Sequence, residues 1–155
     1  MIKLSHSGTS VELTRFKATA SFPRSQDGQS RLGVDHSYAG NAYANGPRRT
    51  THMWQFTAQV DEAQWQRLQL IDSKSQAAGR TAPYSGFEIE VLDKTQTITE
   101  MTQSRAADGI VTNNADGSVT YFPVWKATFV NLELEQEGRV RWAICSLKEA
   151  SSTTP

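Results

Sequence analysis

The sequence predicts a mainly β fold, either a β-sandwich or a split β-barrel of about eight strands. It also predicts one flanking α-helix at residues 61–73 and a long loop at residues 23–51. Apolar residues recur at every second position in most segments, whereas a helical spacing occurs once, directly after a strand. Clusters of turn-forming residues separate these segments. The 155 residues suit one domain, which we expect at residues 1–150 with a flexible tail at 151–155.

The first residues predict a β-hairpin. Ile2 and Leu4 are two apart, a Ser-Gly-Thr-Ser turn follows, and Val11 and Leu13 are again two apart. A further strand is expected to begin at Phe16 and to continue to residue 22 with Ala and Phe on one face. Because Leu13 and Phe16 differ in parity, we expect a bulge or a corner between them.

Residues 23–51 contain many Gly, Ser and Asn residues and show no sustained period. A segment of this length is unusual inside a compact domain, where connections of about 4 to 6 residues are typical. We interpret it as an inter-subunit arm whose contact residues are Tyr38, Tyr43, Arg48 and Arg49. A surface loop without a partner is the alternative.

Residues 53–60 alternate between apolar and polar and predict a strand that leads directly into the helix. Asp61 fits the N-cap, and Gln64 three residues later completes a capping-box pattern. The expected helix has about three turns and ends near the segment KSQAAG, where Gly79 can adopt a left-handed cap. Trp54 and Trp65 are expected to lock this helix across the sheet. The structural core is predicted to contain the aromatic residues Trp54, Phe56, Trp65, Trp125 and Trp142.

The second half of the chain predicts further strands. Phe87, Ile89 and Val91 share one face, a short strand is expected around Ile98, and residues 112–118 (TNNADGS) form a turn. Residues 119–135 predict one long strand whose parity changes between Phe129 and Val130. This change indicates a bulge or a strand that is buried on both faces. In the closing strand Val140, Trp142 and Ile144 alternate with Arg141, Ala143 and Cys145.

The composition argues against several function classes. Sixteen basic and sixteen acidic side chains cancel, so we expect neither specific nucleic-acid binding nor membrane association. His6, His36 and His52 show no metal-ligand spacing, and no nucleotide-binding or nucleophile motif is present. Glu88 and Glu90 fit a solvated strand face better than a catalytic pair. The single Cys145 suits a reducing cytoplasm. We therefore expect no enzyme activity, no catalytic residue, no metal and no cofactor.

The order of these segments resembles the tail-tip proteins of long-tailed bacteriophages, namely distal tail proteins and related minor tail proteins. The resemblance rests on "HMWQFTAQVDEAQWQRLQLIDSKSQAAG", "YSGFEIEVLD" and the closing "FPVWKATFVNLELEQEGRVRWAICSLKE". It covers residues 52–149 and, more loosely, residues 1–22. It is a pattern of strands and one helix that contains no catalytic signature.

The resemblance implies a structural protein of the virion, located at the tail tip or baseplate and assembled in the host cytoplasm. Such a protein forms a ring, expected to be a homohexamer. The ring acts as a hub or adaptor that joins the tail tube to the central hub and to peripheral baseplate proteins. The alternative function is a monomeric β-sandwich binding module, for example one that binds carbohydrate through exposed aromatic residues.

Overall fold

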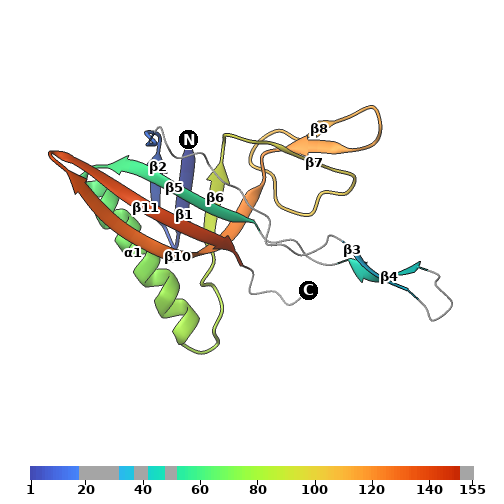
Figure 1. Cartoon of the computed structure of the whole chain (residues 1–155), viewed down its shortest axis with the longest axis horizontal. Coiled ribbons are helices and arrows are strands. Elements are labelled where there is room, and N and C mark those ends of the chain that lie inside the picture. The colour runs from blue at the N-terminus through green and yellow to red at the C-terminus, as the bar shows by residue number, and fades with distance from the viewer. Residues whose placement is uncertain (18–31, 37–41, 48–51, 151–155) are drawn as a thin grey trace.

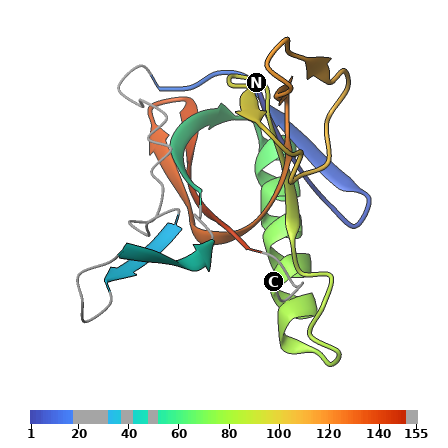
Figure 2. The same cartoon turned by 90° about the vertical axis from the view of Figure 1, so that its right-hand side faces the viewer.

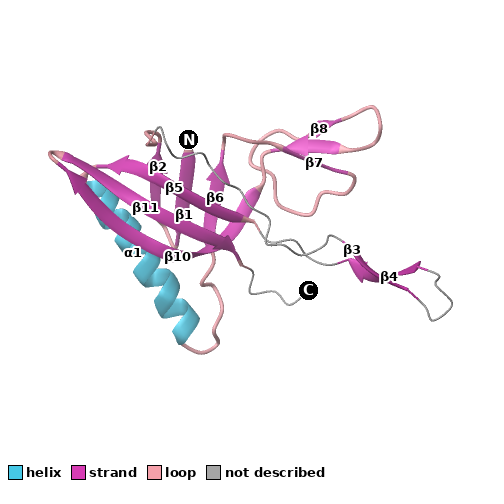
Figure 3. Cartoon of the chain, in the orientation of Figure 1, coloured by secondary structure: helices cyan, strands magenta, loops and turns pink. Residues whose placement is uncertain are grey.

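The computed structural model describes residues 1–17, 32–36, 42–47 and 52–150. They form one α-helix and eleven β-strands, more strands than the sequence predicts (Figures 1 and 3). The first five strands are β1 (Ile2–His6), β2 (Thr9–Leu13), β3 (Leu32–His36), β4 (Ala42–Pro47) and β5 (Met53–Val60). After α1 (Glu62–Arg80) come β6 (Ile89–Asp93), β7 (Ile98–Glu100), β8 (Thr112–Asn113), β9 (Val119–Tyr121), β10 (Val124–Glu137) and β11 (Val140–Glu149). The predicted mainly β class with one helix is confirmed.

Six strands form an antiparallel sheet in the order β2-β1-β6-β10-β11-β5. The sheet curls until its two ends meet, as Figure 2 shows. The closing segment follows β2: the backbone N–H of Lys17 donates to the Thr57 carbonyl at 2.9 Å, and that of Gln59 donates to the Arg15 carbonyl at 2.7 Å. The chain therefore leaves β1 after Leu13 and pairs with β5 at Phe16. The corner predicted between these residues closes a barrel.

Helix α1 lies in the part of the barrel wall that strand pairing leaves open. β6 pairs with β10 over residues 124–127. Beyond Ala127, no described strand pairs with the β10 edge that faces away from β11. α1 buries Leu68, Ile71 and Ser75, and Gln64 on its first turn donates to the Glu12 carbonyl of β2. The fold is thus a split barrel with the helix in the split.

The capping box of α1 is present as predicted: the Asp61 carboxylate accepts from the Gln64 backbone, and the Gln64 side chain accepts from the Asp61 backbone. The helix nevertheless continues to Arg80, past the expected end at residue 73. Its last turns pack on the following segment, because Ser75 donates a hydrogen bond to the Phe87 carbonyl. Gly79 also lies against the Phe87 side chain. Gly79 is therefore inside the helix, and the predicted left-handed cap is wrong.

The predicted loop at residues 23–51 is corrected in part. β3 and β4 pair antiparallel within it and stand apart from the barrel (Figure 1). These strands contain glycine, alanine and asparagine and few large apolar residues, so the alternation that predicts a strand is weak in them. Most of the predicted strand at residues 16–22 lies outside the described residues.

The parity change in the late strand is a β-bulge at Val130. The pairing with β11 shifts between Phe129 and Asn131, so Leu132 returns to the inner face opposite buried Cys145. The bulge was one of two predicted readings, and it is the one that the register confirms. Pro123 separates β9 from β10, so the predicted single strand is two.

Candidate functional site

The outer half of the barrel wall beyond the bulge is the clearest candidate contact surface. We call residues 131–144 the distal hairpin. They contain the last part of β10, the turn and the first part of β11. β5 pairs with the β11 strand of this hairpin, with Gln59 opposite Trp142. β10 is an edge strand here. Val130 at the bulge is 61 % exposed and Leu134 is 38 % exposed.

The outer face of the distal hairpin combines an acidic row with an apolar row. Glu133, Glu135 and Glu137 lie on β10, and their cross-strand partners on β11 are Ile144, Trp142 and Val140 respectively. The three carboxylates are exposed, whereas the three β11 side chains are half-buried. We call these six residues the hairpin face.

Lys17 is the basic side chain that crosses the hairpin face. Its Nζ lies 5.5 Å from the centre of the Trp142 ring and donates to Glu137 Oε1 at 2.7 Å. This hydrogen bond, together with the nearby charge of Glu135, raises the pKa of Lys17 above its usual value. Within the described residues, Glu133 and Glu135 make no direct ion pair. The indole Nε1 of Trp142 is buried and also lacks a hydrogen-bond partner in that part of the chain.

The opposite end of β10 carries a buried aromatic cluster. Trp125 packs against the Trp54 ring at a centroid distance of 5.4 Å and against the His52 ring at 4.2 Å. The guanidinium of Arg105 covers the Trp125 ring, with its Cζ 4.3 Å from the ring centre. Trp54 and Trp125 are at most 5 % exposed.

Arg105 also fastens the small sheet β7-β9-β8 to this end of the barrel. Its Nη2 donates to Glu149 at 2.9 Å and its Nη1 donates to Glu100 at 3.3 Å. The Tyr121 hydroxyl donates to Glu100 as well, at 2.7 Å. Burial disfavours the charged form of Glu100, but hydrogen bonds from Ser104 and Tyr121 and the charge of Arg105 outweigh it, so its pKa lies below the usual value. This cluster is a structural clamp.

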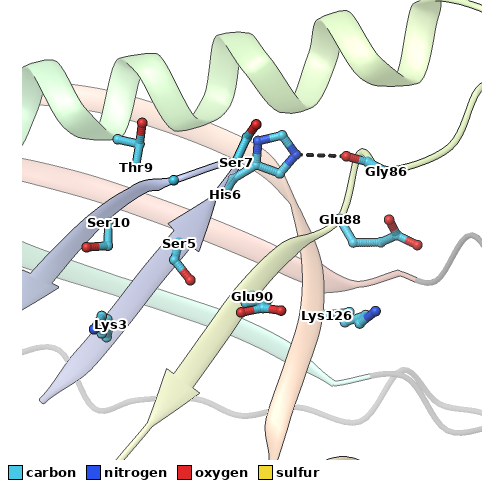
Figure 4. Close-up of a pocket in the computed structure, with 11 residues that line it drawn as sticks. Lys3, Ser5, His6, Ser7, Thr9, Ser10, Gly86, Glu88, Glu90 and Lys126 are labelled. Atoms are coloured by element: carbon cyan, nitrogen blue, oxygen red, sulfur yellow. Dashed lines mark hydrogen bonds between the residues drawn. The ribbon is translucent and has the colours of Figure 1, made fainter.

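A second surface feature is an open hollow of about 640 Å³ on β1, β2 and the segment before β6. Figure 4 shows Lys3, Ser5, Glu88, Glu90 and Lys126 around it. Its lining mixes both charges with small hydroxyl side chains and includes no Phe, Trp or Tyr. The buried His6 donates a hydrogen bond from Nε2 to the Gly86 carbonyl at 2.8 Å, since a carbonyl oxygen can only accept. Glu88 and Glu90 therefore lie among cations on an open surface, as expected for a solvated face.

Two observations concern metal binding and thiol chemistry in the described residues. Over residues 1–17, 32–36, 42–47 and 52–150, no group of three His, Cys, Asp or Glu side chains could hold a metal ion. Burial raises the pKa of the Cys145 thiol to about 12, so the reactive thiolate is absent at neutral pH.

The predicted contact residues fall largely outside the described part of the chain. Tyr38, Arg48 and Arg49 lie in segments that the structure does not describe, and Tyr43 lies on β4 with its side chain likewise outside the description.

Among the predicted core residues, Trp54, Phe56 and Trp125 are buried, and Trp65 is half-buried against the core. Both side chains pack in or against the same core, and the expectation that together they lock the helix across the sheet stays a prediction. Trp54 contacts the aromatic cluster at the start of β5, and about 20 Å of strand separates it from Val60 at the end that leads into the helix.

Trp142 is the predicted core residue that the structure places elsewhere. In β11 the buried residues are Ala143, Cys145 and Leu147, which pair with Ala58, Phe56 and Trp54 of β5 respectively. The narrow barrel interior accepts the smaller side chains of β11, and the bulky Trp142 and Ile144 point outward. The hairpin face was therefore missed from the sequence. A usable signal was the second apolar phase, Ala143-Cys145-Leu147, which runs through the same strand.

The chain matches no protein-family model, no curated protein and no solved structure. In the described part of the chain, no helix has the length and apolar character to cross a lipid bilayer.

Proposed function

We propose that this protein is a structural subunit of a phage tail tip or baseplate, which forms a ring and joins the tail tube to the central hub and peripheral proteins. The observation that carries the proposal is the distal half of β10. From Thr128 to Glu137 this strand has no described strand partner on one edge, and it presents apolar and acidic side chains to solvent. An edge without a strand partner can pair with another chain where helix α1 does not cover it.

Two further features support an assembling subunit. The split barrel with its capped helix supplies a rigid body, and the β3–β4 hairpin projects from it (Figure 1). A formal charge of zero lets many copies pack around one axis without strong repulsion. The resemblance to phage tail-tip proteins in the order of strands and helix points in the same direction.

The carbohydrate-binding alternative gains less support. A glycan platform requires aromatic rings that are exposed together on one face. Two of the four tryptophans are buried, and the other two, Trp65 and Trp142, are half-buried on different elements.

The proposal is tested by light scattering and electron micrographs of the purified chain over a range of concentrations. We expect a monomer at high dilution and ring-shaped particles of defined mass at higher concentration. In micrographs of virions, antibodies against this chain should bind at the tail tip. A chain that remains monomeric at every concentration and binds no tail component would overturn the proposal.

A further inference from the structure

We propose that the hairpin face of one copy binds the β3–β4 arm of a second copy, so that subunits join head to tail. The arm comprises residues 23–51, which include β3 and β4. This inference rests on the proposed ring function and adds to it a definite pair of contacting surfaces.

Charge is the first argument. Residues 23–51 contain four arginines and two aspartates, a formal charge of +2, so the remainder of this neutral chain must carry −2. On the hairpin face, three carboxylates project from alternate positions of one strand, and Lys17 bonds one of them. Arg48 and Arg49 follow β4 directly in the sequence. Arginine is the residue best suited to carboxylates, because its planar guanidinium can bond both oxygens.

The apolar row supplies the second argument. Val140, Trp142 and Ile144 form a half-buried stripe beside the glutamates. Trp, Tyr and Arg are enriched among the residues that carry most of the binding energy at protein interfaces. The arm contains Tyr38 and Tyr43. A tyrosine hydroxyl or a backbone carbonyl of the arm is also an acceptor of the kind that the buried Nε1 of Trp142 lacks.

The geometry favours a contact between two copies over a contact within one copy. The contact joins two different surfaces of the protein, so it is heterologous, and repeated heterologous contacts close into a ring when the rotation allows. The β3–β4 hairpin points away from the barrel (Figure 2).

The test uses charge reversal in the full-length chain. One variant carries Glu133→Lys and Glu135→Lys, and the other carries Arg48→Glu and Arg49→Glu. Each alone should weaken self-association at least about tenfold, because like charges then face one another. Higher salt should reduce the effect of both variants. The matched control is Glu88→Lys with Glu90→Lys, which reverses two glutamates two residues apart beside the hollow of Figure 4. This control should assemble like the wild type.

Mixing the two variants gives the sharpest result. The arm of the first variant is complementary to the face of the second, and the reversed arm of the second is complementary to the reversed face of the first. The mixture should therefore assemble with alternating subunits, although each variant alone associates weakly. A mixture that stays monomeric would overturn the head-to-tail contact, as would variants that assemble like the wild type. In either case wild-type rings would leave the proposed function standing, whereas a wild type that never assembles would contradict both.

Discussion

The two halves of β10 have the same secondary structure but different environments. Before the bulge at Val130, the strand is paired on both edges over part of its length and buries Trp125 and Ala127. After the bulge it is paired on one edge, and its glutamates are exposed. One strand thus holds the barrel together at one end and presents a surface at the other. Changes in the first half should therefore affect stability, and changes in the second half should affect association.

The largest expected effect is that of Trp125→Ala. This side chain contacts His52, Trp54 and Arg105 at once, and its removal should lower the free energy of unfolding by about 3 to 5 kcal/mol. Urea denaturation followed by circular dichroism measures the loss. Leu134→Ala, in the exposed half of the same strand, is the control and should cost less than about 1 kcal/mol. Equal losses at the two sites would refute the division of the strand.

Arg105→Gln should have the next largest effect. It removes the guanidinium that bonds the Glu149 carboxylate, whose side chain is 5 % exposed, at a cost of about 3 kcal/mol. Hydrogen exchange should rise first in β7, β8 and β9, which Arg105 joins to the barrel. The matched control is Arg141→Gln, because the Arg141–Glu62 pair at the distal end is 37 % and 60 % exposed and should contribute about 0 to 1 kcal/mol. If the two variants lose the same stability, the clamp is not the stronger link.

Deletion of Val130 should affect the distal half alone. Without the extra residue, Leu132 and Leu134 would move to the outer face and Glu133 would move inward, since a one-residue slip exchanges the faces of a strand. We expect a loss of about 1 to 3 kcal/mol and faster hydrogen exchange in the distal hairpin. Val130→Ala keeps the bulge and should change stability by less than about 0.5 kcal/mol. An undisturbed hairpin in the deletion variant would show that the bulge does not set the faces.

The same strand shows how far the sequence carries a structural argument. The bulge, the corner after Leu13 and the capping box at Asp61 were predicted because each depends on a few neighbouring residues. The outward position of Trp142 was not predicted, because both phases of β11 contain apolar residues, and the barrel's small interior decides between them. The end of α1 was missed for a similar reason. Its last turn packs against Phe87, a residue beyond the helix that the helical spacing does not include. The hairpin face arises from the pairing of β10 with β11 and has no motif of its own.

A smaller, pH-limited effect is expected at Glu100. Since its folded-state pKa lies below the ordinary glutamate value of 4.5, its contribution is fully present above that value and is lost as the pH falls through the folded pKa. The melting temperature of the wild type should therefore fall as the pH drops below about 4.5. Glu100→Gln should melt lower at neutral pH and show a shallower fall. Parallel curves for the two proteins would mean that the carboxylate contributes nothing to folding.

The smallest expected effect on stability is that of Trp142→Phe. The indole N–H that this change removes has no acceptor among the described residues, so its loss removes a buried donor that gains nothing from folding. The phenyl ring keeps a surface for the Lys17 ammonium, which lies over the present ring. The lost ring volume offsets this gain, and the unfolding free energy should stay within about 0.5 kcal/mol of the wild type. Trp125→Phe is the matched control and should lose more, because a cavity would form inside the aromatic cluster. A loss at Trp142 as large as that at Trp125 would mean that the outer face is part of the core, and the comparison between the two halves of β10 would fail.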